Sequence, residues 1–308
     1  MIVMCGEALI DMLPRQSAEG AAVFQPFAGG SVFNVAVALG RLGVPSAFFG
    51  GLSTDFFGTI LRRALAESHI DVSLASVSDR PTTLAFVSLT DGKAEYAFFD
   101  EHSAGRMITG DDLPPLPAEA TAMHFGSFPL AAEPCGSAFE ALMQREHLSR
   151  VISLDPNIRP SLIKNRDAYL ERLMHLVGMS DIVKFSDDDL AWIAPGEAFE
   201  AVAESWLERG AKLIVMTRGA NGATARSRHA SATVPAVKVK VADTIGAGDT
   251  FSAATLKWFE ERSLLTKHAF ARLTEEQIAD ALGFAAKAAS ITASRPGADP
   301  PWLREMNP

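Results

Sequence analysis

The 308-residue sequence has few cysteines and no long apolar run. Cys5 and Cys135 are its only cysteines, which is too few for a disulfide framework or a four-cysteine metal site. No stretch approaches the ~20 apolar residues that a membrane-spanning helix needs. The first residues also lack the basic and apolar regions of a secretory signal. We therefore expect a cytoplasmic protein whose two thiols are buried and inert.

A basic surface and two common nucleotide-binding loops are also missing. The net charge is −9, whereas proteins that coat nucleic acid usually present a basic face. The sequence contains neither a Gly-x4-Gly-Lys-Ser/Thr loop nor a dinucleotide-binding fingerprint, and its histidines show no metal-ligand spacing. An anionic small ligand is still compatible with this charge, because a few amides and one or two cations can form a local phosphate site.

The pattern along the chain indicates an α/β protein. Hydrophobic residues make up 48% of the chain and charged residues 21%, as in globular proteins. Short apolar runs predict strands at 1–5, 47–50, 122–125, 151–154, 181–185 and 212–216. Helical spacing predicts helices at 31–42, 56–68, 133–147, 166–177, 199–209, 246–262 and 274–293. Strands that alternate with helices predict a mostly parallel sheet covered on both faces.

Two regions near the N-terminus interrupt this alternation. Residues 83–89 and 95–99 are strand-like and flank Asp91-Gly92, a strong hairpin signal. Together with residues 13–27, they predict a small antiparallel element beside the main sheet. We find no long flexible linker and no internal repeat.

The most specific feature is the heptad DTIGAGD at residues 243–249. It follows an alternating run at 237–241, interpreted as a strand, and precedes an apolar helical stretch. Small residues at a helix N-terminus let backbone N–H groups approach a phosphate, and the helix dipole favours negative charge there. Asp249 lies at the mouth of this turn, where a carboxylate is suited to accept the proton of an attacking hydroxyl. The alternative is an ordinary glycine turn with Asp249 as a helix cap.

With the following Thr250-Phe251, this heptad resembles the C-terminal signature of the ribokinase-like (PfkB) carbohydrate kinases. GGSVFNVA at 29–36 resembles the N-terminal signature, and the resemblance covers essentially the whole chain. Within the family, the segments at 81–87, 125–127 and 153–160 are most similar to those of bacterial fructokinases. The chain has Ser31-Val32-Phe33 where fructokinases commonly carry Ala-Pro-Ala.

The resemblance implies a three-layer α/β/α ribokinase-like fold with a mostly parallel central sheet. Residues 1–308 would form a single kinase domain, with a small β lid from about 12–28 and 82–105. The general base would be Asp249. The anion hole would consist of the amides of Gly246, Ala247 and Gly248. The sugar-binding residues would be Asp11, Gly29, Gly30 and Asn34.

Other candidates follow from positions at the ends of predicted strands, where ligands of open α/β sheets bind. Arg159 would contact sugar or phosphate, with a structural salt bridge as the alternative. Asp189 would order water on Mg²⁺. The alternative is an acidic residue that is favoured at a helix start for structural reasons alone. The residues expected to bind ATP are Lys184, Ser186, Thr217, Gly219, Gly222, Gly248 and Ala286. The family's K⁺ loop is matched by Asp243, Ile245, Thr292, Arg295 and Gly297, although Pro301 replaces a common Ser and leaves K⁺ dependence open.

The predicted function is transfer of the γ-phosphate of MgATP to a primary hydroxyl of a ketohexose, with fructose favoured. One alternative is 2-keto-3-deoxygluconate, whose carboxylate would want an arginine in the lid. The chain has Phe98-Phe99-Asp100-Glu101 there, which disfavours an anion, but the nearby Arg106 keeps this alternative open. A second alternative is a sugar- or nucleotide-binding regulator without catalysis.

The resemblance also implies a possible homodimer, because family members often dimerise through the lid. Three lid residues, Phe86, Phe98 and Phe99, would fit a lid sheet covered by a second copy. They would equally fit positions that face the sugar or the chain's own core.

Overall fold

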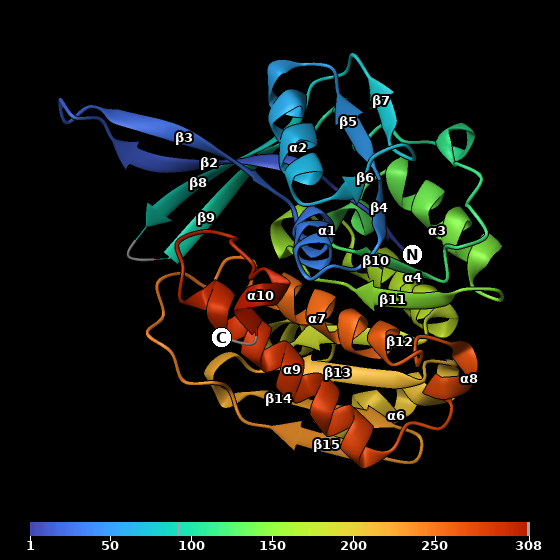
Figure 1. Cartoon of the computed structure of the whole chain (residues 1–308). Coiled ribbons are helices and arrows are strands. Elements are labelled where there is room, and N and C mark those ends of the chain that lie inside the picture. Colours follow the sequence, from blue (N-terminus) through green and yellow to red (C-terminus); the bar gives the residue numbers. More distant parts are fainter. Residues whose placement is uncertain (91–92, 307–308) are drawn as a thin grey trace.

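The computed structural model describes residues 1–90 and 93–306 (Figure 1). The expected hairpin turn at Asp91-Gly92 lies outside these residues. Within the described chain, a nine-stranded sheet has the order β15-β14-β13-β12-β11-β10-β1-β4-β6. Its strands are β1 (Ile2–Cys5), β4 (Ser46–Phe49), β6 (Ile70–Asp71), β10 (Ala122–Gly126), β11 (Val151–Asp155), β12 (Ile182–Ser186), β13 (Leu213–Thr217), β14 (Ala223–Ser227) and β15 (Ser231–Val234). All pairs from β6 to β13 are parallel, and β14 and β15 continue the sheet antiparallel.

Helices cover both faces of this sheet, so the predicted three layers are present (Figure 1). Alternate residues of β1 enter different cores: Ile2 and Met4 pack on one side, Val3 and Cys5 on the other. One face is covered by α1 (Ser31–Arg41), α7 (Ala247–Glu261) and α9 (Glu275–Ala293), and the other by α3 (Cys135–Glu146), α4 (Arg166–Met179) and α6 (Phe199–Arg209). The remaining helices are α2 (Phe56–Glu67), α5 (Asp187–Ile193), α8 (Lys267–Phe270) and α10 (Leu303–Met306), with 3-10 turns η1 (Gly110–Asp112), η2 (Phe128–Ala131), η3 (Pro160–Leu162) and η4 (Gly219–Asn221).

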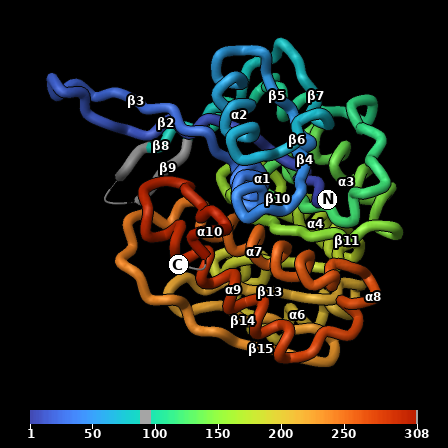
Figure 2. The backbone as a smooth tube through the Cα atoms, viewed as in Figure 1, coloured from blue at the N-terminus to red at the C-terminus, as the bar shows by residue number. Residues whose placement is uncertain are grey.

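A second sheet is formed by the two interrupting regions of the sequence. Its strand order is β3 (Ala22–Gly29), β2 (Leu9–Gln16), β8 (Thr83–Thr90) and β9 (Lys93–Phe99). The β2–β3 and β8–β9 pairs are antiparallel, as predicted, and β2 pairs with β8 in parallel. This sheet projects from the body of the molecule (Figures 1 and 2). A separate two-stranded ribbon joins β5 (Gly51–Ser53) to β7 (Ser76–Ser78).

The register of the second sheet decides which side chains share a face. Asp11 pairs with Ala85, and Ala85 pairs with Phe98, so Asp11 and Phe98 point to the same side. Phe86 and Phe99 lie on the opposite side, where their rings are 5.4 Å apart, and Phe24 packs against Phe86 at 5.0 Å. Of the three aromatic residues left open by the sequence, Phe98 therefore faces away from the other two.

The strand predicted at 237–241 is wrong. Residues 235–241 have no regular secondary structure, and Val237, Val239 and Val241 are all exposed. Alternation of valine and lysine predicts a half-buried strand only when a neighbouring strand supplies hydrogen bonds, and β15 ends at Val234. The N–H groups of Ala242 and Asp243 instead donate to the carbonyl of Ala293, which ties this segment to the end of α9.

Two further expectations concern the cysteines and membrane spans. Cys5 and Cys135 are free and buried, as predicted, and burial raises the pKa of the Cys135 thiol to about 12. Among residues 1–90 and 93–306, no helix has the length and apolar character needed to cross a membrane.

Candidate active site

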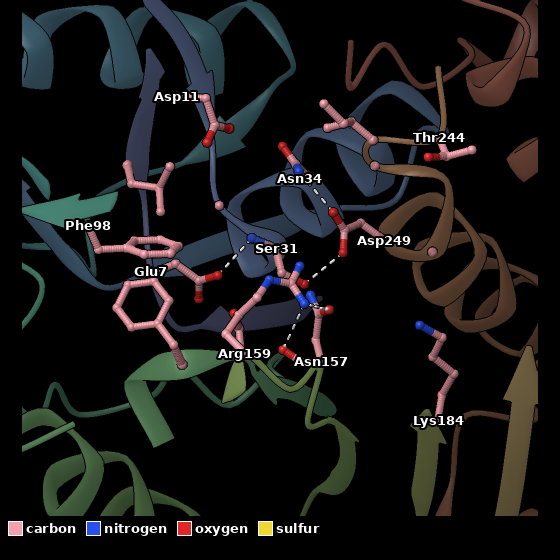
Figure 3. Close-up of a pocket in the computed structure, with 17 residues that line it drawn as sticks. Glu7, Asp11, Ser31, Asn34, Phe98, Asn157, Arg159, Lys184, Thr244 and Asp249 are labelled. Atoms are coloured by element: carbon pink, nitrogen blue, oxygen red, sulfur yellow. Dashed lines mark hydrogen bonds between the residues drawn. The ribbon is translucent and has the colours of Figure 1, made fainter. Parts of the chain in front are cut away.

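A polar hollow of about 300 Å³ lies where the second sheet meets the N-terminus of α7. Its walls come from segments far apart in the sequence: the β1–β2 connection, the start of α1, the ends of β9 and β11, and the turn at 244–249. Figure 3 shows the acidic, amide and basic side chains of these segments around one space. The hollow lies at the carboxyl ends of the parallel strands, where ligands of such sheets bind.

Asp249 is buried in the first turn of α7, at one wall of this hollow. Its Oδ1 accepts a hydrogen bond from Ser31 Oγ at 2.7 Å, and its Oδ2 accepts one from Asn34 Nδ2 at 2.9 Å. Burial raises the pKa of the Asp249 carboxyl, while these two donors and Lys184 oppose the rise. A carboxylate with a raised pKa is a competent general base near neutral pH.

The glycine turn before Asp249 has the geometry expected of an anion site. Gly246 adopts φ 74°, a left-handed conformation that favours glycine, and a Cβ there would lie 2.6 Å from the Cβ of Ala298. The first N–H groups of a helix have no partner within the helix. The N–H of Ala247, predicted with those of Gly246 and Gly248 to form an anion hole, donates over 3.3 Å to the carbonyl of Thr244.

Asp11 reaches the same hollow from β2, opposite Asp249 (Figure 3). A Cβ added to Gly29 would lie 2.2 Å from Asp11 Oδ2, so only glycine at this position leaves room for the carboxyl. Burial raises the pKa of Asp11 to about 6, against the lowering effect of Arg159. Gly30 adopts φ 106° and begins α1. Asp11, Gly30 and Asn34 of the predicted sugar-binding set thus line the same pocket as Asp249, whereas Gly29 supports Asp11 from outside the lining.

Glu7 is a pocket residue that no sequence motif indicated. It is 4% exposed, and its Oε1 accepts a hydrogen bond from the Ser31 N–H at 2.7 Å. Burial raises its pKa to about 7. A Glu that directly follows a buried strand and a glycine was the available signal, but nothing in the sequence distinguished it from an exposed turn acid.

Arg159 lines the hollow, as the sequence predicted, beyond the end of β11. Its Nη1 donates to Asn157 Oδ1 at 2.8 Å, and Asn157 has φ 38°. Asn157 was not predicted, although it too faces the hollow (Figure 3). Left-handed backbone at a non-glycine residue is strained and occurs often at functional sites.

Lys184, which the sequence assigned to the nucleotide, lines the hollow beside the glycine turn. Its Nζ donates to Asp155 Oδ2 at 2.8 Å, and a Cβ on Gly248 would lie 3.2 Å from that nitrogen. Burial disfavours the charged amine, but Asp155, together with Asp189 and Asp249, outweighs this effect and raises the pKa of Lys184. The lysine therefore presents a positive charge beside the glycine turn, with Asp155, which the sequence reasoning missed, as its partner.

Ser186 and Asp189 form a helix cap at the end of β12. Asp189 Oδ2 accepts hydrogen bonds from the N–H and hydroxyl of Ser186, and its Oδ1 accepts one from the Ile158 N–H at 2.8 Å. Both carboxylate oxygens therefore already bind protein donors, and neither faces the hollow directly. This arrangement does not suit direct ligation of a metal. In the described part of the chain, no group of three or more His, Cys, Asp or Glu side chains could hold a metal ion.

The residues matched to a cation loop lie together behind the glycine turn. Asp243 Oδ1 accepts a hydrogen bond from Ile245, and its Oδ2 accepts one from Gly297, both at 3.0 Å. The N–H of Arg295 donates to the Thr292 carbonyl, and the Arg295 side chain pairs with Glu305. The segment around Asp243 and the segment around Gly297, which are 54 residues apart in the sequence, are therefore joined by a hydrogen bond.

The other residues predicted to bind the nucleotide lie outside the hollow. Thr217 ends β13, and Gly219 begins the short turn after it. A Cβ on Gly222 would lie 2.1 Å from the Val234 carbonyl oxygen, so close packing against β15 is sufficient to require this glycine. Ala286 is buried in α9. None of these four residues is among those that line the hollow.

A buried carboxylate facing an anion turn and a polar pocket is the arrangement of a phosphotransferase that acts on a hydroxyl. Residues 1–305 match the pfkB family of carbohydrate kinases, and the chain belongs to this family. It is 50% identical over 278 residues to a fructokinase of Rhizobium leguminosarum bv. trifolii, covering 90% of this chain and 85% of that relative.

Solved structures agree with this assignment. The fructokinase of Xylella fastidiosa with bound ATP superimposes with a TM-score of 0.89 at 29% identity, covering 99% of this chain and 96% of that one. A double mutant of the fructokinase of Vibrio cholerae O395, in its fructose, ADP and potassium ion bound form, gives a TM-score of 0.83 at 25% identity, with 96% and 93% covered. The ribokinase-like fold expected from the sequence is therefore confirmed.

The close approach of Gly29 to Asp11 leads to a prediction. Gly29→Ala should displace the Asp11 carboxyl and raise the KM for the sugar by about 10- to 100-fold, the range expected for losing a charge-assisted hydrogen bond. Steady-state kinetics with varied sugar would measure it. Gly283→Ala is the matched control, because no atom lies within 4 Å of its added Cβ. An unchanged KM in Gly29→Ala would contradict the placement of Asp11.

Proposed function

We propose that this protein is an ATP-dependent fructokinase, which transfers the γ-phosphate of ATP to a primary hydroxyl of D-fructose and produces fructose 6-phosphate and ADP. The observation that carries the proposal is the buried Asp249 carboxylate, which lies between the glycine turn and the hydroxyl-binding side chains. The 50% identity to a fructokinase supports the choice of sugar.

The reaction requires one proton transfer and one displacement. Asp249 accepts the proton of the sugar hydroxyl, while the oxygen of that hydroxyl forms a bond to the γ-phosphorus of ATP. The bond between this phosphorus and the β–γ bridging oxygen breaks, and ADP leaves. The N–H groups of Gly246 and Gly248, with the dipole of α7, stabilise the charge on the transferring group. Lys184, kept cationic by Asp155, adds a fixed positive charge beside this position. The N–H of Ala247 joins those of Gly246 and Gly248 when its 3.3 Å hydrogen bond to the Thr244 carbonyl is replaced by one to the phosphate.

The charges of the pocket favour a neutral sugar over a sugar acid. Glu7, Asp11 and Asp249 all line the hollow, and each has a pKa raised by burial. A substrate carboxylate would add a further negative charge to this group. Arg106, which left the sugar-acid alternative open, forms a salt bridge with Asp100 at 3.0 Å and donates to the Glu133 carbonyl. In our proposal, Asp11 and Asn34 bind hydroxyls of the sugar. Gly29 and Gly30 let the sugar approach the backbone closely, and Arg159 contacts it from the opposite wall of the hollow.

The nucleotide enters as MgATP, and its phosphates hold the metal. Asp189 orders water on the Mg²⁺ and does not bind it directly, which agrees with the engagement of both its oxygens by protein donors. Ser186, Thr217, Gly219, Gly222, Gly248 and Ala286 border the nucleotide in this proposal. Backbone groups of Asp243, Ile245, Thr292, Arg295 and Gly297 hold K⁺ behind the glycine turn. The potassium ion in the V. cholerae fructokinase structure supports this last step.

The second sheet acts as a lid within a single kinase domain spanning residues 1–308. The lid, residues 12–28 and 82–105, carries Phe98 over the hollow. Its other face carries Phe24 and Phe99, which are 49% and 62% exposed. Apolar side chains on a projecting sheet are typical of an interface, and we propose that this face pairs with the same face of a second copy.

The proposed activity is tested by coupled assays over fructose, ribose, tagatose and 2-keto-3-deoxygluconate. We expect the highest kcat/KM with fructose, no turnover without Mg²⁺, and slower turnover when Na⁺ replaces K⁺. Preference for the sugar acid would favour that alternative. If the protein bound these sugars but phosphorylated none of the four, the result would favour the non-catalytic regulator and reject the proposed kinase activity.

Removal of the base provides a second test. Asp249→Asn should lower kcat by roughly 10²- to 10⁴-fold, because an amide cannot take up the proton, while the KM for ATP changes little. Rates of ADP release measure the effect, and a thermal unfolding midpoint near that of the wild type shows that the variant is folded. A variant with close to full kcat would refute the role of Asp249.

The lid interface predicts a dimer of the 32.9-kDa chain in solution. A variant carrying both Phe24→Asp and Phe99→Asp should be monomeric, since burying two new carboxylates is costly. Light scattering coupled to size exclusion reads the mass directly. Leu148→Asp, at an 82% exposed position in the turn after α3, is the control and should stay dimeric. A wild type that is monomeric at micromolar concentration would contradict the interface.

A further inference from the structure

Ser31 connects two buried carboxyl groups across the pocket (Figure 3). Its hydroxyl donates to Asp249 Oδ1 at 2.7 Å, and its N–H donates to Glu7 Oε1 at 2.7 Å. The residue is 7% exposed. We propose that Ser31 is a positioning residue of phosphoryl transfer, whose hydroxyl holds the Asp249 carboxylate in the orientation that accepts the proton of the sugar. This inference rests on the proposed role of Asp249 as the base.

The placement of Ser31 is determined by the start of α1. Gly30 adopts φ 106°, and a Cβ there would lie 3.0 Å from both the Cγ and the carbonyl oxygen of Glu7. The chain therefore passes close over Glu7, whose carboxylate binds the first N–H of the helix. A carboxylate at a helix N-terminus is favoured by the helix dipole. Glu7 thus anchors the backbone from which the Ser31 hydroxyl points to Asp249.

Asn34 completes the arrangement three residues later on the same helix face. It donates to Asp249 Oδ2 at 2.9 Å, while Ser31 donates to Oδ1. Two donors from one helix turn hold both oxygens and so fix the rotation of the carboxylate. Each carboxylate oxygen can accept two hydrogen bonds, so one further position on each remains for the sugar hydroxyl.

The surrounding charges determine the direction of the effect. Lys184 lowers the pKa of Asp249, while Asp155 raises it, and Glu7 and Asp11 also interact with its charge; Arg159 faces Asp11 from the opposite wall. The Ser31 hydroxyl donates to the charged form of Asp249 and so lowers its pKa. Removing the hydroxyl should raise this pKa, and the base should then lose its proton only at higher pH.

The test compares Ser31→Ala with the wild type across pH. The acid limb of kcat/KM for fructose reports ionisation in the free enzyme, and it should move to higher pH by about one unit in Ser31→Ala, as expected for losing one hydrogen bond to a charged group. The plateau of kcat should also fall several-fold. Ser31→Thr restores a hydroxyl and should return the acid limb toward that of the wild type.

The matched control is Ser180→Ala. Ser180 is also a buried serine with one short hydrogen bond, from its Oγ to the Leu176 carbonyl at 2.8 Å, but it precedes β12 at the opposite edge of the sheet. Its pH profile should match that of the wild type. An acid limb that is unchanged in Ser31→Ala, or that moves equally in Ser180→Ala, would overturn the inference.

A measurement without turnover separates this inference from the proposed function. Carbon-13 NMR of labelled aspartate carboxyls, with Asp249 identified as the resonance missing from Asp249→Asn, follows the same ionisation directly. An upward shift of its midpoint in Ser31→Ala supports the contact even if the acceptor sugar is not fructose. Lack of fructose turnover by the wild type would count against the fructokinase proposal alone, whereas an unmoved Asp249 titration would reject the role of Ser31.

Discussion

The cost of burying the Asp249 carboxylate governs the arrangement around it. A buried charge is unfavourable unless it receives hydrogen bonds or opposite charge, and Asp249 receives both. Ser31 and Asn34 donate to its two oxygens, α7 contributes its N-terminal dipole, and Lys184 supplies positive charge. These supports come from three different elements, so the buried Asp249 carboxylate is stable only when the main sheet, α1 and α7 are assembled.

Close packing of backbone allows these groups to share so small a space. A Cβ on Gly29 would clash with Asp11, one on Gly246 would clash with Ala298, and one on Gly248 would crowd Lys184. The glycines of the two family signatures therefore have a physical reason: Gly29 leaves room for the Asp11 carboxyl, Gly246 for Ala298, and Gly248 for the Lys184 ammonium. Lys184 packs beside Gly248 in this way, and its hydrogen bond to Asp155 links the hollow to β11.

The sequence indicated the parts of the fold and site that depend on local pattern. Alternating strands and helices predicted the parallel sheet, and the glycine turn with Asp249 predicted the centre of the site. Glu7, Asn157 and Asp155 were missed because their roles arise from neighbours distant in sequence. Val237–Val241 was misread as a strand for the same reason, since alternation does not reveal whether a partner strand exists. Lys184 was predicted to bind the nucleotide, but its pairing with Asp155 was not predicted, because only the sheet order brings the two side chains together.

The charge pattern also explains why one pocket suits both a base and a neutral sugar. Crowded carboxyls raise one another's pKa, as Asp249 does for Glu7 and Asp11. Burial, with the charge of Asp155, raises the pKa of Asp249 itself, while its donors on α1 favour the ionised form that the proposed base requires. An uncharged polyol satisfies such a pocket because its hydroxyls donate to carboxylates without adding negative charge. The same crowding of carboxyls disfavours an anionic acceptor, which agrees with the proposed base and a neutral sugar in one pocket.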